Sequence, residues 1–511
     1  MCMRKQNKIW SVRLAEVLFA FCCALLVPVV AKAQDLRLVH GDCTPDLADG
    51  GQTRGVRRGL PKVRKDWDAS RVYKQMVVLV SFRDVDFQME DPNKTYNSVF
   101  NESGYNKRNG VGCVADYFRD QSGGRFNMEF DVFGPIKLDT LANPYTAPTE
   151  KIRNYGKDQF RNAMLELLKQ NPDHDFKQYD WDGNGSVDQV ICVYAGLCGN
   201  QGQGSYGHIW PNTGSFTTVT APDGTKIANF SASGELWKNN LGSCGIGTIC
   251  HEFSHSLGLP DIYPTTNDAG YSVVDEWDLM DGGNFTNYGW CPPDYSPLEK
   301  MLFGWLTPVE LTEPATIKNM KTLADGGDVY IIKKTEDNYY LLENRQWQGW
   351  SLGVPGRGLV IYHVDYLESK WSSNSVNNVK GAYRYELVHA DGLDYDAWDN
   401  LLELRDAKTK YINKTRMNCL YLSTSPFPWT TDSTATVDQA LTDSETPITN
   451  IRMTDEGLVS FDFRGGDLDA IHDLMTPRAA GDAYYDLSGR RVTGRLGKGI
   501  YIVEGKKVII Q

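Results

Sequence analysis

Residues 251–261 read His251-Glu252-Phe253-Ser254-His255-Ser256-Leu257-Gly258-Leu259-Pro260-Asp261. In a helix, His251 and His255 lie on one face, one turn from each other. Glu252 follows the first histidine, where its carboxylate can reach a water held by a metal ion. Gly258 tolerates positive φ, so it can end the helix and turn the chain until Asp261 faces the two imidazoles. The stretch therefore predicts a zinc site with a general base beside it.

The third ligand of this site has two candidates. Imidazole nitrogens and carboxylate oxygens are usual zinc ligands, and three protein ligands leave the fourth position for water. Asp261 completes the spacing H-E-x-x-H-x-x-G-x-x-D, in which the related metzincin pattern has a third histidine. Glu276 is the alternative, because some zincins take this ligand from a later glutamate. The turn at Gly258 favours Asp261.

A methionine follows in a turn-forming context. The run Trp277-Asp278-Leu279-Met280-Asp281-Gly282-Gly283 places Met280 just before two glycines. Metzincin-type sites have a Met-turn beneath the metal, and we interpret Met280 as the structural residue of such a turn. A methionine that merely fills a gap in the core is the alternative.

The composition is that of an ordinary globular protein. The chain has 511 residues, enough for two to four domains, with 41% hydrophobic and 23% charged residues. The formal net charge is −12 and no segment carries a dense basic face, which argues against a nucleic-acid partner. Beyond the N-terminal segment, no stretch is long and apolar enough to span a membrane.

The N-terminus has the pattern of a signal peptide, residues 1–33. A basic start, an apolar run from Leu18 to Val30 and the triplet Ala31-Lys32-Ala33 predict export and cleavage. Residues 34–70 are polar with a basic cluster, and we interpret them as a propeptide or leader. Within it, Cys43 suggests a latent zymogen, since a thiolate can occupy the open zinc position. A mobile N-terminal arm is the simpler alternative.

Hydrophobic patterns divide the rest of the chain into three parts. Residues 71–310 mix strands with helices, including the helix from about Thr248 to Leu257. They predict an α+β catalytic domain, a metzincin-like zinc peptidase domain with a twisted sheet. Short alternating strands in residues 311–465 predict a β-rich domain. Residues 466–511, with a hairpin near 499–510, predict a small C-terminal β tail.

Residues 180–188 form a candidate calcium loop. Four oxygen-bearing side chains stand at positions 1, 3, 5 and 9 of an EF-hand-like pattern: Asp180, Asp182, Asn184 and Asp188. Gly185 at position 6 permits the sharp turn. Position 12 is Ile191 rather than glutamate, so the loop is not an EF-hand. We favour a structural calcium ion, and an Asx-rich turn without a metal is the alternative.

These segments together resemble the immune inhibitor A family of secreted bacterial metallopeptidases, over roughly residues 72–465. The most specific block is His-Glu-Phe-Ser-His-Ser-Leu-Gly-Leu-Pro-Asp-Ile-Tyr at 251–263, supported by the loop 180–188 and by Trp277–Met280. The resemblance implies that Glu252 is the catalytic base and that the zinc ligands are His251, His255 and Asp261.

The C-terminal tail carries a second resemblance. Tyr485–Arg491 and Lys498–Val503 are similar to the tails of Bacteroidetes proteins exported by the type IX route. This resemblance implies a secretion machinery that recognises residues 466–511. Together with the signal peptide, it predicts a secreted or cell-surface protein.

The sequence thus leads us to expect a zinc-dependent endopeptidase. It would hydrolyse peptide bonds of extracellular proteins through a zinc-bound water that Glu252 activates. The expected partners are protein or peptide substrates, with no nucleic acid. The alternative is a catalytically degenerate binding protein, an adhesin, on a peptidase scaffold, and a third reading is a hydrolase of non-peptide amides.

Overall fold

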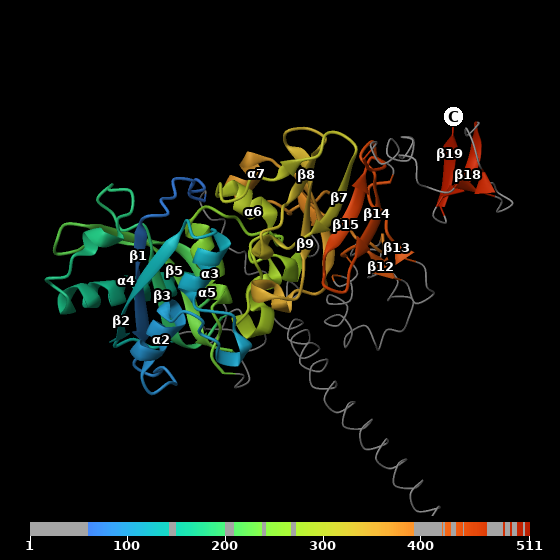
Figure 1. Ribbon diagram of the computed structural model, residues 1–511. Helices are drawn as coiled ribbons and strands as arrows, with labels where there is room; N and C mark the ends of the chain where they lie inside the picture. Colours follow the sequence, from blue (N-terminus) through green and yellow to red (C-terminus); the bar gives the residue numbers. More distant parts are fainter. Residues whose placement is uncertain are drawn as a thin grey trace, which may run out of the picture.

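The computed structural model describes residues 60–142, 150–199, 209–237, 242–266, 272–392, 422, 425–430, 436–442, 444–467, 484–485, 491–492, 498–503 and 506–510. The predicted signal peptide and most of the predicted leader, including Cys43, lie outside these residues. In Figure 1 a region of mixed helices and strands, coloured blue to green, precedes a β-rich region coloured yellow to red. This α+β architecture confirms the predicted fold class.

The first region is built on a five-stranded sheet, whose strands are β1 (Val72–Ser81), β2 (Asn127–Lys137), β3 (Val190–Leu197), β4 (Asn212–Thr220) and β5 (Lys226–Leu236). Their order is β2-β1-β3-β5-β4. The first four in this order run parallel, and β4 pairs antiparallel with β5 at one edge. Parallel strands are covered on both faces, which explains the unbroken hydrophobic run from Val77 to Val80.

Helices cover both faces of this sheet. They are α2 (Pro92–Asn101), α3 (Val114–Gln121), α4 (Glu150–Gln170), α5 (Gly247–Ser256) and α6 (Pro297–Leu302), with 3-10 helices η2 (Lys107–Asn109), η3 (Phe176–Tyr179), η4 (Asp275–Trp277) and η5 (Gly282–Gly289). Met164 of α4 shares a core with Val78 on one face. Phe253 of α5 shares a second core with Val77 on the other face. Neighbouring residues of β1 enter different cores because strand side chains alternate.

The β-rich region contains two larger sheets. The first has the order β11-β10-β9-β8-β6, formed by β6 (Val309–Glu310), β8 (Tyr330–Lys333), β9 (Asn338–Arg345), β10 (Gly358–Asp365) and β11 (Tyr385–Leu387). The second has the order β14-β15-β7, formed by β7 (Ala315–Met320), β14 (Ile448–Met453) and β15 (Val459–Phe463). Short elements complete the region: η6 (Leu323–Asp325), η7 (Gly349–Gly353), α7 (Glu368–Ser372), β12 (Trp429–Thr430) and β13 (Thr436–Val437).

The β-rich region and the first region share a hydrophobic core. On one face of β9 and β10, Leu342 and Ile361 pack in a cluster with Phe461 of the second sheet. On the opposite face, Leu341 and Val360 belong to the same core as helix α5. The sequence pattern changes near residue 310, but the two regions on either side of this point share one hydrophobic core.

The N-terminal residues that the structure describes also contact this core. Arg64 N–H donates to Leu257 O at 3.1 Å, at the end of α5, and Leu60 N–H donates to Ser372 O at 3.0 Å, at the end of α7. The Trp67 indole donates to Phe303 O at 2.8 Å. Residues 60–67, which the sequence pattern assigns to the leader, thus connect the two regions.

The tail contains a sheet of order β17-β16-β18-β19, formed by β16 (Tyr484–Tyr485), β17 (Arg491–Val492), β18 (Gly499–Val503) and β19 (Lys506–Ile510). The β18–β19 pairing confirms the hairpin expected near 499–510. Among the helices that the structure describes, none has the length and apolar character that a membrane crossing requires.

Candidate metal centre and general base

Helix α5 carries the two histidines and the glutamate into the protein interior, where all of its residues from Gly247 to His255 are buried. The first residue of the helix is Gly247, where a Cβ would lie 2.0 Å from Asn284 O of η5, so this close approach requires glycine. Beyond its end, Gly258 has a φ of +107°. A side chain at Gly258 would also meet Val63 Cα at 2.6 Å. Gly258 therefore permits both the predicted turn and the close approach of the N-terminal segment.

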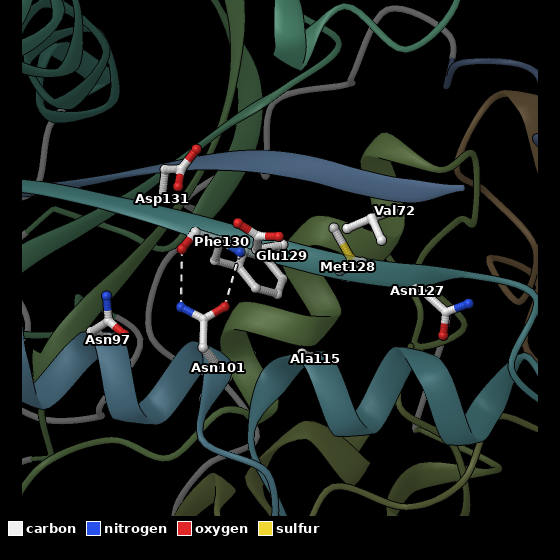
Figure 2. Close-up of a pocket in the computed structure, with 9 residues that line it drawn as sticks. All are labelled: Val72, Asn97, Asn101, Ala115, Asn127, Met128, Glu129, Phe130 and Asp131. Carbon is white, nitrogen blue, oxygen red and sulfur yellow. Dashed lines mark hydrogen bonds between the residues drawn. The ribbon is translucent and has the colours of Figure 1, made fainter. Parts of the chain in front are cut away.

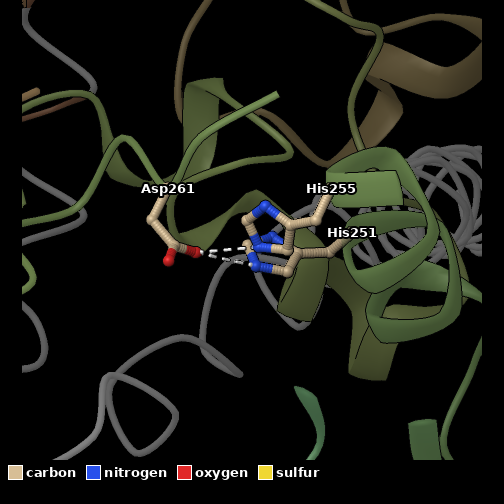
Figure 3. A group of neighbouring side chains, drawn as sticks. All are labelled: His251, His255 and Asp261. Atoms are coloured by element: carbon tan, nitrogen blue, oxygen red, sulfur yellow. Dashed lines mark ion pairs between the residues drawn. The ribbon is translucent and has the colours of Figure 1, made fainter. Parts of the chain in front are cut away.

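The turn after Gly258 brings Asp261 to the two histidines, as Figure 3 shows. Asp261 Oδ1 lies 3.2 Å from His251 Nε2 and 3.1 Å from His255 Nε2. All three side chains are buried, and their ligand atoms lie within 4.8 Å of one another. Glu276 is also buried, but it is not a member of this group.

Backbone carbonyls hold both imidazoles in one orientation. His251 Nδ1 is 2.8 Å from Leu279 O, and His255 Nδ1 is 2.7 Å from Leu259 O. A carbonyl oxygen only accepts, so each Nδ1 carries the proton and donates it. Each Nε2 then presents its lone pair toward Asp261, which is the arrangement of metal-ligating histidines.

The charges around His251, His255 and Asp261 favour a positive charge between these three side chains. Burial alone lowers the pKa of His251, but the hydrogen bond with Asp261 and the nearby Glu252 carboxylate outweigh burial and raise that pKa above its usual value. A buried carboxylate that faces two nitrogen lone pairs needs a cation or a proton among them. Two imidazoles and one carboxylate are a donor set that fits zinc.

Glu252 is buried beside the three converging side chains, on the next position of the same helix. Thr213 of the edge strand β4 donates its hydroxyl to Glu252 Oε2 at 3.0 Å and also contacts Glu252 O. The threonine thus connects strand β4 to both the backbone and the carboxylate of Glu252. No sequence motif marked Thr213, because its partner is 39 residues away.

Asn374 is a second residue that the sequence motifs do not mark. Its side-chain Nδ2 donates to Asp261 Oδ2 at 2.6 Å, and its Oδ1 accepts from Asp261 N at 2.5 Å. Asn374 follows helix α7 in the β-rich region, 113 residues from Asp261. An asparagine in a polar stretch carries no signal that would connect it with an aspartate so distant in sequence.

Met280 lies in a buried turn that is hydrogen-bonded to His251 through the neighbouring Leu279. Leu279 O accepts from His251 Nδ1, and Met280 O accepts from Ile262 N at 2.9 Å. Asp278 Oδ1 accepts from Met280 N at 2.7 Å, which closes the turn. The methionine side chain is fully buried, so it packs in the core beside the turn that orients His251.

The loop 180–188 gathers three carboxylates. Ligand oxygens of Asp180, Asp182 and Asp188 lie within 4.8 Å of one another, whereas Asn184 donates its side-chain N–H to Asp182 Oδ2. Arg64 Nη2 donates to Asp188 Oδ1 at 3.0 Å. Burial raises the pKa of Asp188 to about 6, opposed by the Trp181 N–H and by Arg64. The loop therefore keeps an excess of negative charge that Arg64 only partly offsets.

A hollow of about 530 Å³ lies elsewhere, along β2 and its flanking helices, and Figure 2 shows its lining. Asn101 of α2 there donates to Phe130 O and accepts from Phe130 N, both at 2.9 Å. These hydrogen bonds connect helix α2 to strand β2. Glu129, also in the lining, forms an ion pair with Lys74 at 2.8 Å. None of the lining residues belongs to the converging group of His251, His255 and Asp261.

The buried helix with its two histidines and glutamate lies against the sheet, and a glycine turn returns an aspartate to the histidines. This arrangement fits the catalytic domain of a metallopeptidase. Residues 67–303 match the family described as Immune inhibitor A peptidase M6, catalytic domain. This match, like the relatives below, supports placing that segment in the peptidase M6 family. Asn374 lies outside the matched residues.

Two curated relatives are similar to the chain. "Immune inhibitor A" of Bacillus thuringiensis subsp. alesti is 25% identical over 321 residues, which cover 53% of this chain and 46% of the relative. "Pre-pro-metalloprotease PrtV" of Vibrio cholerae serotype O1 (strain M66-2) is 23% identical over 243 residues, which cover 43% of this chain and 26% of the relative. The chain thus spans less than half the length of these relatives.

Proposed function

We propose that the protein is a secreted zinc endopeptidase in which His251, His255 and Asp261 bind the metal and Glu252 is the general base. The observation that carries this proposal is the convergence of two Nε2 atoms and one carboxylate oxygen beside a buried glutamate. The peptidase M6 match over residues 67–303 supports it.

Each residue of the proposed site has its own role in peptide-bond hydrolysis. A zinc ion bound here would supply a lowered water pKa and a polarised substrate carbonyl. Glu252 accepts the proton of the attacking water and passes it to the leaving amine. The Thr213 hydroxyl holds the Glu252 carboxylate in place, and Leu279 O and Leu259 O hold the two imidazoles. We assign Met280 the structural role of a Met-turn.

Cleavage of an unfolded protein tests this function. The secreted form, loaded with zinc, is incubated with casein in the presence and absence of 1,10-phenanthroline. We expect fragments only without the chelator and recovery when zinc is restored. Zinc-loaded protein that leaves casein and a peptide library intact would favour the degenerate binding scaffold instead.

We also propose that the loop 180–188 binds a structural calcium ion through Asp180, Asp182, Asn184 and Asp188. The proposal is supported by the three carboxylates that converge there. Like-charged carboxylates repel one another, and a divalent cation would remove that repulsion. The loop leads directly into β3, so the ion would stabilise the entry to a central strand.

Calcium is therefore expected to raise the thermal stability of the zinc-loaded protein. A bound ion at about 100 times its Kd should raise Tm by roughly 5 °C, because it stabilises only the folded state. The variant Asp182→Asn should lose this rise, whereas Asp173→Asn, an exposed aspartate outside the loop, should retain it. Differential scanning calorimetry with and without calcium makes the measurement. An equal rise in both variants would exclude the loop as the site.

The ends of the chain carry three further proposals. Residues 1–33 direct export, residues 34–70 form a leader that is removed at least in part, and residues 466–511 are recognised by a secretion machinery. The contacts of Leu60, Arg64 and Trp67 with the folded body support a removal of the leader that ends before residue 60. Mass spectrometry of the secreted protein would give both mature termini.

A further inference from the structure

The residues from Asn374 to Asn378 hold the segment that carries the third metal ligand. Beyond the two bonds to Asp261, Asn374 O accepts from Thr265 Oγ1 at 2.9 Å. Asn378 accepts from Thr265 N at 2.7 Å and donates to Thr265 Oγ1 at 2.8 Å. Asn377 donates to Ile262 O at 3.1 Å. Three asparagines of the β-rich region thus fix the chain between Asp261 and Thr265.

Within this set, only Asn374 reaches the ligand side chain. Its amide donates to Asp261 Oδ2 and accepts from the backbone N–H of the same residue. With Oδ2 and the backbone both held, Asp261 can present only Oδ1 to His251 and His255. The amide is neutral, so it holds the carboxylate without adding a positive charge that would compete with a cation.

The backbone conformation at Asn374 is compatible with asparagine and places its amide against Asp261. Asn374 adopts a φ of +55°, a left-handed conformation that asparagine tolerates better than most residues. Its N–H donates to Trp371 O at 3.1 Å, and the buried Trp371 side chain belongs to the core shared with α5. The amide is therefore anchored to the same core as the histidines that Asp261 faces.

We propose that Asn374 is a positioning residue of the metal centre, which makes the β-rich region a necessary part of the catalytic site. This inference rests on the proposed function, because it assumes that Asp261 binds zinc. It assigns a role to a residue outside the matched segment 67–303. Outer-shell partners of this kind typically change metal affinity by about 10–100-fold.

The test compares Asn374→Gly with Asn378→Ala. Glycine removes the side chain but tolerates the positive φ, so the backbone is not strained. Asn378→Ala is the matched control, since it also removes two side-chain hydrogen bonds across the same interface but leaves Asp261 held. Zinc affinity is measured by competition with a chromophoric chelator, kcat is measured at saturating zinc, and circular dichroism verifies folding.

We expect Asn374→Gly to raise the Kd for zinc by about 10–100-fold, with kcat recovering in part at saturating zinc. Asn378→Ala should bind zinc as the unaltered protein does. An unchanged zinc affinity in Asn374→Gly would overturn the inference, and so would an equal loss in both variants. Unaltered protein that binds no zinc would instead refute the proposed function, and the inference with it.

Discussion

Replacing Glu252 by glutamine should lower kcat by about 10²–10⁴-fold while the protein keeps its zinc. Glutamine has nearly the same shape and can still accept the Thr213 hydroxyl hydrogen bond. It cannot accept the proton of the attacking water at neutral pH. Because Glu252 is not a member of the converging ligand group, metal content should stay at the level of the unaltered enzyme.

Two measurements together decide this prediction. Zinc stoichiometry by atomic emission and the cleavage rate of a fluorogenic peptide are compared for Glu252→Gln and for Glu129→Gln. Glu129 is exposed on β2 and does not belong to the converging ligand group, so its variant should behave as the unaltered protein. A Glu252→Gln protein that cleaves at full rate would show that another group is the base.

Replacing Asp261 by asparagine should abolish cleavage by removing the metal itself. Direct loss of a ligand should weaken zinc binding beyond the roughly 10–100-fold that outer-shell changes produce. Glu276→Gln is the matched control. Like Asp261→Asn, it replaces a buried carboxylate by the amide of the same side chain. That variant should keep its zinc because Glu276 is outside the converging group.

This pair of variants separates the two ligand schemes that the sequence allows. Zinc affinity is read by chelator competition, and activity by peptide cleavage after dialysis against zinc. If Glu276→Gln loses the metal and Asp261→Asn retains it, the third ligand has been assigned to the wrong carboxylate. Circular dichroism of both metal-free variants shows whether either change acts through misfolding.

Strand prediction succeeded where hydrophobic patterns are continuous and fell short where polar residues interrupt them. The continuous hydrophobic run of strand β1 begins only at Met76, but the strand itself begins at Val72. Gln75 tolerates burial in this strand because its amide donates to Gln189 O at 2.7 Å. A polar residue that satisfies its hydrogen bonds inside a sheet gives no local sign of burial. Likewise, the change of pattern near residue 310 does not reveal the core that the two regions share.

The sequence by itself determined the ligand spacing, the helix and the glycine turn, because these depend on residues a few positions apart. His251, Glu252, His255, Gly258 and Asp261 all lie within one helix and the turn that follows it.

The tertiary structure alone decided what holds these groups in place. The partners Thr213, Leu279 and Asn374 are 39, 28 and 113 residues from the groups they contact. Hydrogen bonds over such separations arise when distant elements pack around common cores, and no local pattern encodes which elements will meet. The chemistry of the site is therefore local in the sequence, whereas its orientation depends on the complete fold.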